Sequence, residues 1–197
     1  MLNIVSAPNP VLSQSAKKVS KIDAKILKFI YEMKQSLLSA RDPIGVGLAA
    51  PQTGRSLQIF IAKPNEKSPI LVFINPVIEK FLDTPTQEKR ESKQSEKTAR
   101  AKEKAGIDKN IQLEGCLSLK DIWGEVKRHP GVLLSYQDEN GKSHSQNFSG
   151  FMATIIQHEE DHLNGILFPK RVLEQKNHLY KSRKDENNED VFEEIEI

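Results

Sequence analysis

The stretch Gln157-His-Glu-Glu-Asp-His162 lies inside the run Phe151–Leu163, and the rest of the chain is organised around it. The run predicts an α-helix, because Asn147 or Ser149 can cap its start and Asn164-Gly165 can end it. The chain is therefore expected to have a central helix that carries chemistry as well as core contacts.

On a helix of 3.6 residues per turn, His158, Glu159 and His162 share one stripe with Ile155. The following pair, Glu160-Asp161, is expected to point away toward solvent. Two imidazoles one turn apart with a carboxylate between them suit a divalent metal ion and a proton carrier beside its bound water. The motif predicts a metal site.

Length and composition are those of one domain large enough to bury a core. The chain has 197 residues, a formal net charge of +2 and a pI near 8.5. This charge is too small to argue for specific nucleic-acid binding, and no apolar run is long enough to predict a membrane span. The start, Met1-Leu-Asn-Ile-Val-Ser6, does not match a signal or transit peptide. A single cysteine suits a reducing compartment, so a cytoplasmic location is expected.

The first half of the chain predicts one helix and two or three strands. Asp23 can cap the helix. Leu57–Ala62 and Ile70–Ile74 are β-branched and aromatic runs that predict a hairpin. Asn75-Pro76 is expected to turn the chain before a further strand at Val77–Phe81.

A glycine-rich stretch and a second hairpin flank the central part of the sequence. Gly45-Val-Gly-Leu-Ala-Ala-Pro-Gln52 lacks the third glycine of a dinucleotide fingerprint and the Lys-Ser/Thr of a phosphate loop, but its glycines allow a close approach to the backbone. Gly131–Gln137 and Lys142–Phe148 alternate on either side of Asn140-Gly141, which predicts a hairpin leading into the helix.

Two polar segments interrupt or follow the predicted catalytic domain of residues 1–173. In residues 83–109, fourteen of the 27 side chains are charged, so this segment is expected to be a surface insertion that contributes little to the core. Residues 174–197 are basic at first and acidic at the end. The last residues alternate like an edge strand, although their polarity favours a solvated tail.

The only thiol lies in Glu114-Gly-Cys-Leu-Ser118. A lone cysteine is more often a small buried apolar residue, but a His-x-x-x-His pair needs a third ligand and a thiolate is a good one. Cys116 is therefore a candidate metal ligand.

Three stretches together resemble the signature motifs of peptide deformylase, in the same order along the chain: Gly45–Gln52, Glu114–Ser118 and Gln157–His162. The resemblance runs from about Ile4 to Leu173 and is broken only by the charged insertion. It implies an α+β fold with short, mostly antiparallel sheets packed around a central metal-binding helix. It also implies removal of the formyl group from the N-terminal formyl-methionine of newly synthesised bacterial proteins, with release of formate.

By this resemblance Cys116, His158 and His162 bind the metal, which in the family is natively Fe(II) and is often exchanged for Ni, Co or Zn. Glu159 is the general acid and base, while Gln52 and the backbone of Leu117 hold the formyl oxygen. Metal-bound hydroxide would attack the formyl carbon as these donors stabilise the oxyanion, and Glu159 would pass the proton to the leaving amine.

The substrate is expected to lie along the glycine-rich stretch as an added strand, with Gly45, Val46, Gly47, Phe151 and Ile155 as candidate contacts. Of these, Val46, Phe151 and Ile155 are candidates for the apolar pocket that takes the methionine side chain. The resemblance also allows a transient contact with the ribosome through the basic segment Lys170–Lys184.

Two further observations refine the comparison with the family. Lys120 stands where the family commonly has Pro, so the loop to Trp123 is expected to differ in shape. Glu114 and Arg128 flank this loop, and we expect them to pair and hold Cys116 in place.

Two rival functions remain open from the sequence. One is an endopeptidase of the His-Glu-x-x-His type, whose third ligand would be a glutamate from Glu174 onward, such as Glu186. The other is an inactive deformylase-like protein that only binds formylated peptides. Loss of metal on substitution of Cys116 separates the first from a deformylase, and formate release separates the second.

Overall fold

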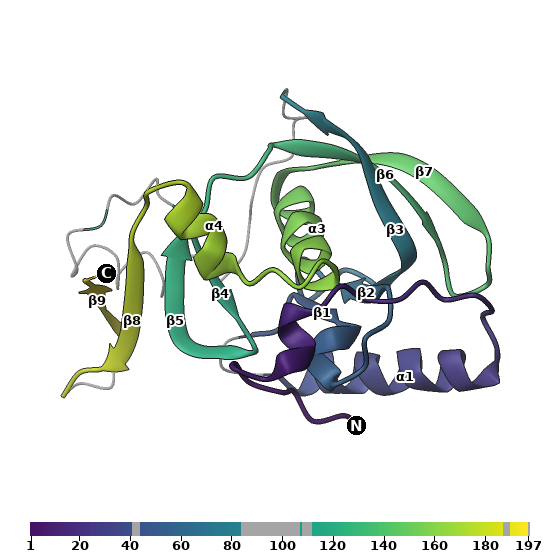
Figure 1. The fold of residues 1–197 in the computed structure, drawn as a ribbon, viewed down its shortest axis with the longest axis horizontal. Helices are drawn as coiled ribbons and strands as arrows, with labels where there is room; N and C mark the ends of the chain where they lie inside the picture. The colour runs from purple at the N-terminus through teal and green to yellow at the C-terminus, as the bar shows by residue number, and fades with distance from the viewer. Residues whose placement is uncertain (41–43, 84–106, 108–111, 187–189, 197) are drawn as a thin grey trace.

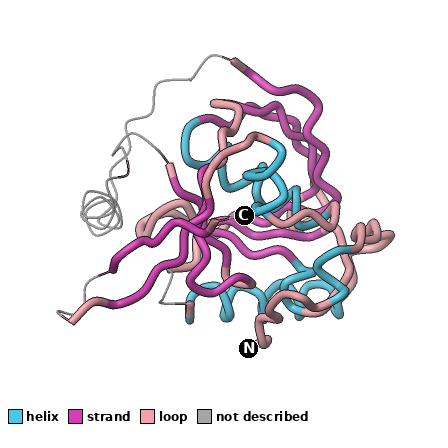
Figure 2. Tube along the Cα trace, turned by 60° about the vertical axis from the view of Figure 1, so that its left-hand side comes forward, coloured by secondary structure: helices cyan, strands magenta, loops and turns pink. Residues whose placement is uncertain are grey.

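The structure is a computed structural model that describes residues 1–40, 44–83, 107, 112–186 and 190–196. Two antiparallel sheets lie on different sides of helix α3 (Gly150–Leu163), with the long helix α1 (Ala24–Ser39) at the bottom of Figure 1. Figure 2 shows the strands of the two sheets diverging from one another. The predicted α+β class, with mostly antiparallel sheets around a central helix, is confirmed.

The larger sheet has the strand order β1-β2-β3-β6-β7. Its strands are β1 (Gly47–Ala49), β2 (Ile59–Ala62), β3 (Leu71–Leu82), β6 (Gly131–Gln137) and β7 (Ser143–Ser149). Short 3₁₀ turns, η1 (Pro10–Ser13) and η2 (Ala50–Thr53), connect the N-terminal elements. Both predicted hairpins are present as β2–β3 and β6–β7.

Strand β2 shows how this sheet separates two cores. Its four residues are all fully buried and alternate between the two faces. Phe60 and Ala62 pack toward α3, whereas Ile59 and Ile61 pack toward α1. Asp23 caps α1 as predicted, accepting hydrogen bonds from the backbone N–H groups of Lys25 and Ile26.

The predicted turn at Asn75-Pro76 is wrong, because β3 continues from Leu71 to Leu82 as one strand. Asn75 has a φ of 50°, and the pairing of β3 with β6 shifts between Ile74 and Val77. The sequence signal for a turn thus marks a bulge at which the strand leaves β2 and continues along β6.

The smaller sheet has the order β4-β5-β8-β9. Its strands are β4 (Leu113–Cys116), β5 (Leu119–Glu125), β8 (Leu179–Lys184) and β9 (Asp190–Ile195), and the short helix α4 (Phe168–Glu174) packs on it. The solvated-tail interpretation of the C-terminus is therefore wrong for β8 and β9. These strands are held by cross-strand pairing and by burial of Tyr180 and Phe192.

Most of the predicted insertion, residues 83–109, lies outside the described residues. Ile107 is described, and it is buried against Tyr180 and Phe192, so at least this residue of the segment contributes to a core. None of the helices in the described part of the chain is long and apolar enough to cross a membrane.

Candidate active site

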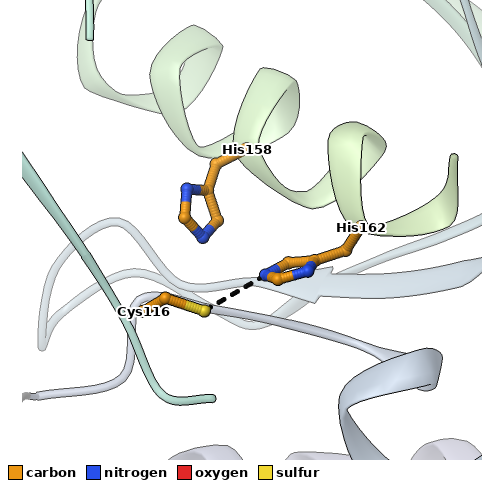
Figure 3. A group of neighbouring side chains, drawn as sticks. All are labelled: Cys116, His158 and His162. Atoms are coloured by element: carbon orange, nitrogen blue, oxygen red, sulfur yellow. Dashed lines mark hydrogen bonds between the residues drawn. The ribbon is translucent and has the colours of Figure 1, made fainter. Parts of the chain in front are cut away.

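Helix α3 brings two of the predicted metal ligands to one point. It starts at Gly150 and ends at Leu163, within one residue of the predicted bounds. His158 and His162 project from successive turns toward Cys116, which ends strand β4 (Figure 3). The Sγ atom of Cys116 lies 3.3 Å from Nε2 of His162, and the ligand atoms of the three residues lie within 4.8 Å of one another.

This group fits a divalent metal ion. Two imidazoles and a thiolate form a donor set that proteins use for zinc and iron, and atoms that each lie about 2.0–2.3 Å from one ion must lie within about 4.6 Å of one another, close to the separation seen here. His162 is 1% exposed and its Nδ1 has no hydrogen-bond partner among the described residues. Burial lowers the pKa of His162, and the neighbouring His158 lowers it further, so the ring is neutral and able to coordinate.

The other imidazole is oriented by a carboxylate. Oε2 of Glu114 lies 2.9 Å from Nδ1 of His158, which leaves Nε2 of that ring to face the metal group. Nε and Nη2 of Arg128 donate to both oxygens of Glu114, at 2.8 and 3.0 Å, so the predicted pairing of these two residues is confirmed. Burial opposes ionisation of Glu114, but the hydrogen bonds from His158 and Arg128 outweigh it and lower its pKa to about 2.

Asp161 corrects the prediction that Glu160-Asp161 points to solvent. Its side chain is buried, and its two oxygens bind Nη1 of Arg128 at 2.7 Å and Nη2 of Arg171 at 2.6 Å. Glu160 is half-buried and accepts a hydrogen bond from Nδ2 of Asn164. A buried carboxylate needs such partners because an unpaired one is very costly.

Glu159 follows His158 directly on α3, and its side chain is enclosed. It is 3% exposed, and its Oε2 has no hydrogen-bond partner among the described residues. Burial raises its pKa to about 7, which is the range in which a group both takes and returns protons at neutral pH. The carboxylate rests against Gly47 of β1, where any Cβ would collide with it.

Gln52 is held so that its amide N–H groups face the site. Its Oε1 accepts a hydrogen bond of 2.8 Å from the backbone N–H of Ala49. Its Nε2 is therefore directed at the Sγ of Cys116 and the Oγ of Ser118, each 3.4 Å away. Leu117, the other predicted oxyanion residue, follows Cys116 in the tight turn between β4 and β5.

The candidate substrate contacts also come together. Ile155 is buried on α3, and Val46 and Phe151 are partly buried in the same cluster between α3 and the larger sheet. Gly45 and Gly47 lie beside them, at and just before the start of the edge strand β1. Lys120 is exposed on β5, and the next residue, Asp121, has a φ of 61°.

Two supports of the site were not predicted. Arg171 of α4 binds Asp161. An Asp and an Arg ten residues apart do not form a recognisable sequence motif, so their pairing could not be predicted. The N-terminal segment joins the two loops of the site, because the N–H of Val5 donates to the carbonyl of Gln52 at 2.8 Å and the N–H of Ala7 donates to that of Ser118 at 3.0 Å.

Among the described residues, the group beside the two histidines that could serve as a third ligand is thus a thiol and not a C-terminal carboxylate. Glu174 binds Arg171 on α4, and Glu186 is exposed. Among the described residues, the group that could hold a metal consists of Cys116, His158 and His162. This arrangement does not favour the endopeptidase alternative.

Comparison with known proteins identifies peptide deformylases as similar to this chain. A family model described as "Polypeptide deformylase" matches residues 1–178. Similar proteins include a peptide deformylase of Borreliella burgdorferi, 35% identical over 85% of both chains, and one of Desulfotalea psychrophila, 33% identical over 93% of this chain and 94% of the relative.

Solved structures agree. A peptide deformylase from Synechococcus elongatus, in complex with actinonin, has a TM-score of 0.69 at 36% identity and covers 87% of this chain and 78% of its own. The peptide deformylase from Thermotoga maritima has a TM-score of 0.68 at 31% identity, with 87% of this chain and 97% of that chain covered.

Proposed function

The chain belongs to the polypeptide deformylase family and removes the formyl group from the N-terminus of newly made proteins, and we propose which of its residues carry out that reaction. Cys116, His158 and His162 hold a divalent metal ion, Glu159 carries the proton, and Gln52 with the Leu117 N–H binds the formyl oxygen. One observation carries this assignment: the buried thiol and two imidazoles converge within 4.8 Å beside a carboxylate whose pKa is raised to about 7.

A divalent ion held by Cys116, His158 and His162 would act as a Lewis acid, lowering the pKa of a water molecule into the neutral range and so supplying the nucleophile near neutral pH. We assign the ion as Fe(II), the metal that the resemblance to the family implies, with Ni, Co or Zn able to replace it because two imidazoles and one thiolate suit all four. Elemental analysis of active protein purified without oxygen tests this assignment, and protein that contains zinc instead of iron after such purification would contradict Fe(II) as the native ion.

Glu159 is suited to move the proton of the reaction. A carboxylate with a pKa of about 7 takes a proton from the attacking water and returns it to the amine nitrogen as the formyl carbon–nitrogen bond breaks. Its burial excludes bulk water, and the lack of a side chain at Gly47 leaves room for it. The products are formate and a free α-amine.

Gln52 and Leu117 stabilise the charge that develops on the formyl oxygen. Because the Ala49 N–H occupies the oxygen of the Gln52 amide, that side chain presents its N–H groups, which are preorganised donors. The Leu117 N–H follows Cys116 in the same turn and supplies the second donor.

The methionine side chain fits the apolar group of Val46, Phe151 and Ile155. The substrate backbone lies along Gly45–Gly47, where β1 is the edge strand of the larger sheet. Replacing Ile155 by Phe is expected to raise KM for formyl-Met peptides more than it lowers kcat, since the change fills the pocket and leaves the reacting groups in place.

The deciding experiment is an assay of formate release from formyl-Met-Ala. The native protein is expected to turn over, whereas Cys116→Ser loses metal and activity together because a hydroxyl is a poorer ligand than a thiolate. Actinonin, present in the Synechococcus elongatus complex, is expected to inhibit. Full turnover and full metal content in Cys116→Ser would remove the thiol from the metal site.

We also propose that the protein works in the bacterial cytoplasm and touches the ribosome transiently. The basic side chains on α4 and β8, among them Lys170, Lys181 and Arg183, could meet ribosomal RNA through charge. Salt-sensitive co-sedimentation with ribosomes, weakened by replacing these three residues with Glu, tests this contact.

A further inference from the structure

The back of the metal-site strand is covered by an aromatic cluster that the assignment of the active site does not use. Along β4, Glu114 and Cys116 point toward α3, so Gly115 between them faces the other side of the sheet. The indole of Trp123, the cross-strand partner of Gly115, lies there. A Cβ built on Gly115 would come within 3.0–3.1 Å of three carbon atoms of that ring.

Trp123 is itself held by the C-terminal strands. Its Nε1 donates a hydrogen bond of 3.2 Å to Oγ of Ser182 on β8. Its ring meets Phe192 of β9 edge to face, with the centroids 5.8 Å apart at 70°. Tyr180 and Ile107 complete the cluster, in which Phe192, Tyr180 and Ile107 are each 6–7% exposed.

We propose that Trp123 is a positioning residue for Cys116, and that the strand pair β8–β9 serves the metal site by clamping this indole against Gly115. The family match ends at residue 178, so that match assigns no role to β8–β9. The physical reason is that Gly115 lies between Glu114 and Cys116 on the strand and faces the opposite side of the sheet. Because the flat, rigid indole packs against Gly115, it restricts the two neighbouring residues of the strand. These are Cys116, the thiol donor, and Glu114, the carboxylate that orients His158.

The absence of a side chain at Gly115 is needed for this packing. Any side chain at position 115 would push the indole away, and a smaller residue at position 123 would leave the strand free to shift. Groups that orient metal ligands change metal affinity by about 10- to 100-fold when they are removed. The expected consequence is faster loss of the metal.

The test measures metal retention apart from turnover, and it builds on the proposed role of Cys116 as a ligand. Protein loaded with Co(II) shows a sulfur-to-cobalt charge-transfer band, and transfer of cobalt to a chelator gives the rate of metal loss. Trp123→Ala is expected to speed that loss by about tenfold or more and to shift the band, while Trp123→Phe largely restores both. Phe192→Ala and Ser182→Ala, which leave β4 and β5 unchanged, shift the rate in the same direction by smaller factors.

Tyr136→Ala is the matched control, because Tyr136 packs on Phe73 and Phe148 in the other sheet. All variants are compared at a temperature at which each is folded. If Trp123→Ala does not fold, Phe192→Ala and Ser182→Ala decide. Unchanged cobalt loss in the β8–β9 variants, or equal acceleration in Tyr136→Ala, would overturn the inference. A parent protein that shows the band but releases no formate would overturn the proposed function alone; a parent without the band would overturn both.

Discussion

Nη1 of Arg128 lies 2.7 Å from Oδ2 of Asp161, and both side chains are more than 90% buried. The same guanidinium binds Glu114, and Asp161 also binds Arg171. Two carboxylates and two guanidinium groups thus neutralise one another behind the metal group. This network ties α3, which carries His158 and His162, to the strand that carries Cys116.

Asp161→Asn should destabilise the protein strongly. Removing one charge from a buried pair leaves its partner uncompensated, which costs about 3–5 kcal/mol. Urea unfolding of the metal-free protein measures the difference. Asp138→Asn is the matched control, since Asp138 pairs with His144 at a more open surface site, and its loss should stay below about 1 kcal/mol. Equal effects of the two substitutions would contradict a special role for the buried network.

Glu159→Gln should separate catalysis from metal binding. Gln keeps the shape of the side chain but cannot carry a proton, so kcat is expected to fall by about 10²–10⁴ while the metal content stays unchanged. Metal content by elemental analysis and formate release are measured on the same sample. If Glu159→Gln lost its metal as Cys116→Ser is expected to, Glu159 would be a ligand and not the proton carrier.

Gly47→Ala should disturb Glu159 directly. The added methyl group would collide with the carboxylate, and overpacking of this kind costs about 1–3 kcal/mol. The expected result is lower stability together with lower kcat. A double-mutant cycle provides the control, because in a Glu159→Ala background the methyl group has room and the stability cost should shrink. An undiminished cost in that background would place the collision elsewhere.

Glu114 should make the metal-free protein less stable in acid. Because its folded-state pKa is lowered from 4.5 to about 2, its stabilising effect is complete above about pH 4.5 and is lost as the pH falls toward 2. A shift of this size corresponds to about 3 kcal/mol. The stability difference between the native protein and Glu114→Gln is measured by urea unfolding from about pH 6 to about pH 3. It should narrow as the pH falls, and a constant difference would falsify the linkage.

Much of the site could be predicted from the sequence because it depends on local spacing. The helical period places His158, Glu159 and His162 on one face whatever surrounds the helix. The cap at Asp23 and the turn at Asn140-Gly141 are also local signals, and the structure contains the helix and hairpin that they predict. The role of Cys116 needed a resemblance over three motifs, since no local rule brings a strand residue to a helix 42 residues later.

The resemblance and the spacing did not reveal which polar residues are buried. Asp161 faces away from the stripe of candidate metal ligands, where a lone helix would meet solvent, but Arg128 from the loop after β5 and Arg171 from α4 enclose it. Asn75-Pro76 has the composition of a turn, although pairing with β6 carries the strand through it. In both cases the outcome depends on partners distant in the chain.

The sequence by itself determined the helix that carries His158, Glu159 and His162 on one face, because periodicity and side-chain chemistry are local properties. The resemblance over three motifs added the third candidate donor and the reaction class. Only the tertiary structure decided that the polar C-terminus forms β8 and β9 and covers Trp123 behind the Cys116 strand. The physical reason is that a strand with alternating polar and apolar residues is stable only when a neighbour supplies its hydrogen bonds and buries one face. Here that neighbour is β5, more than fifty residues earlier in the chain.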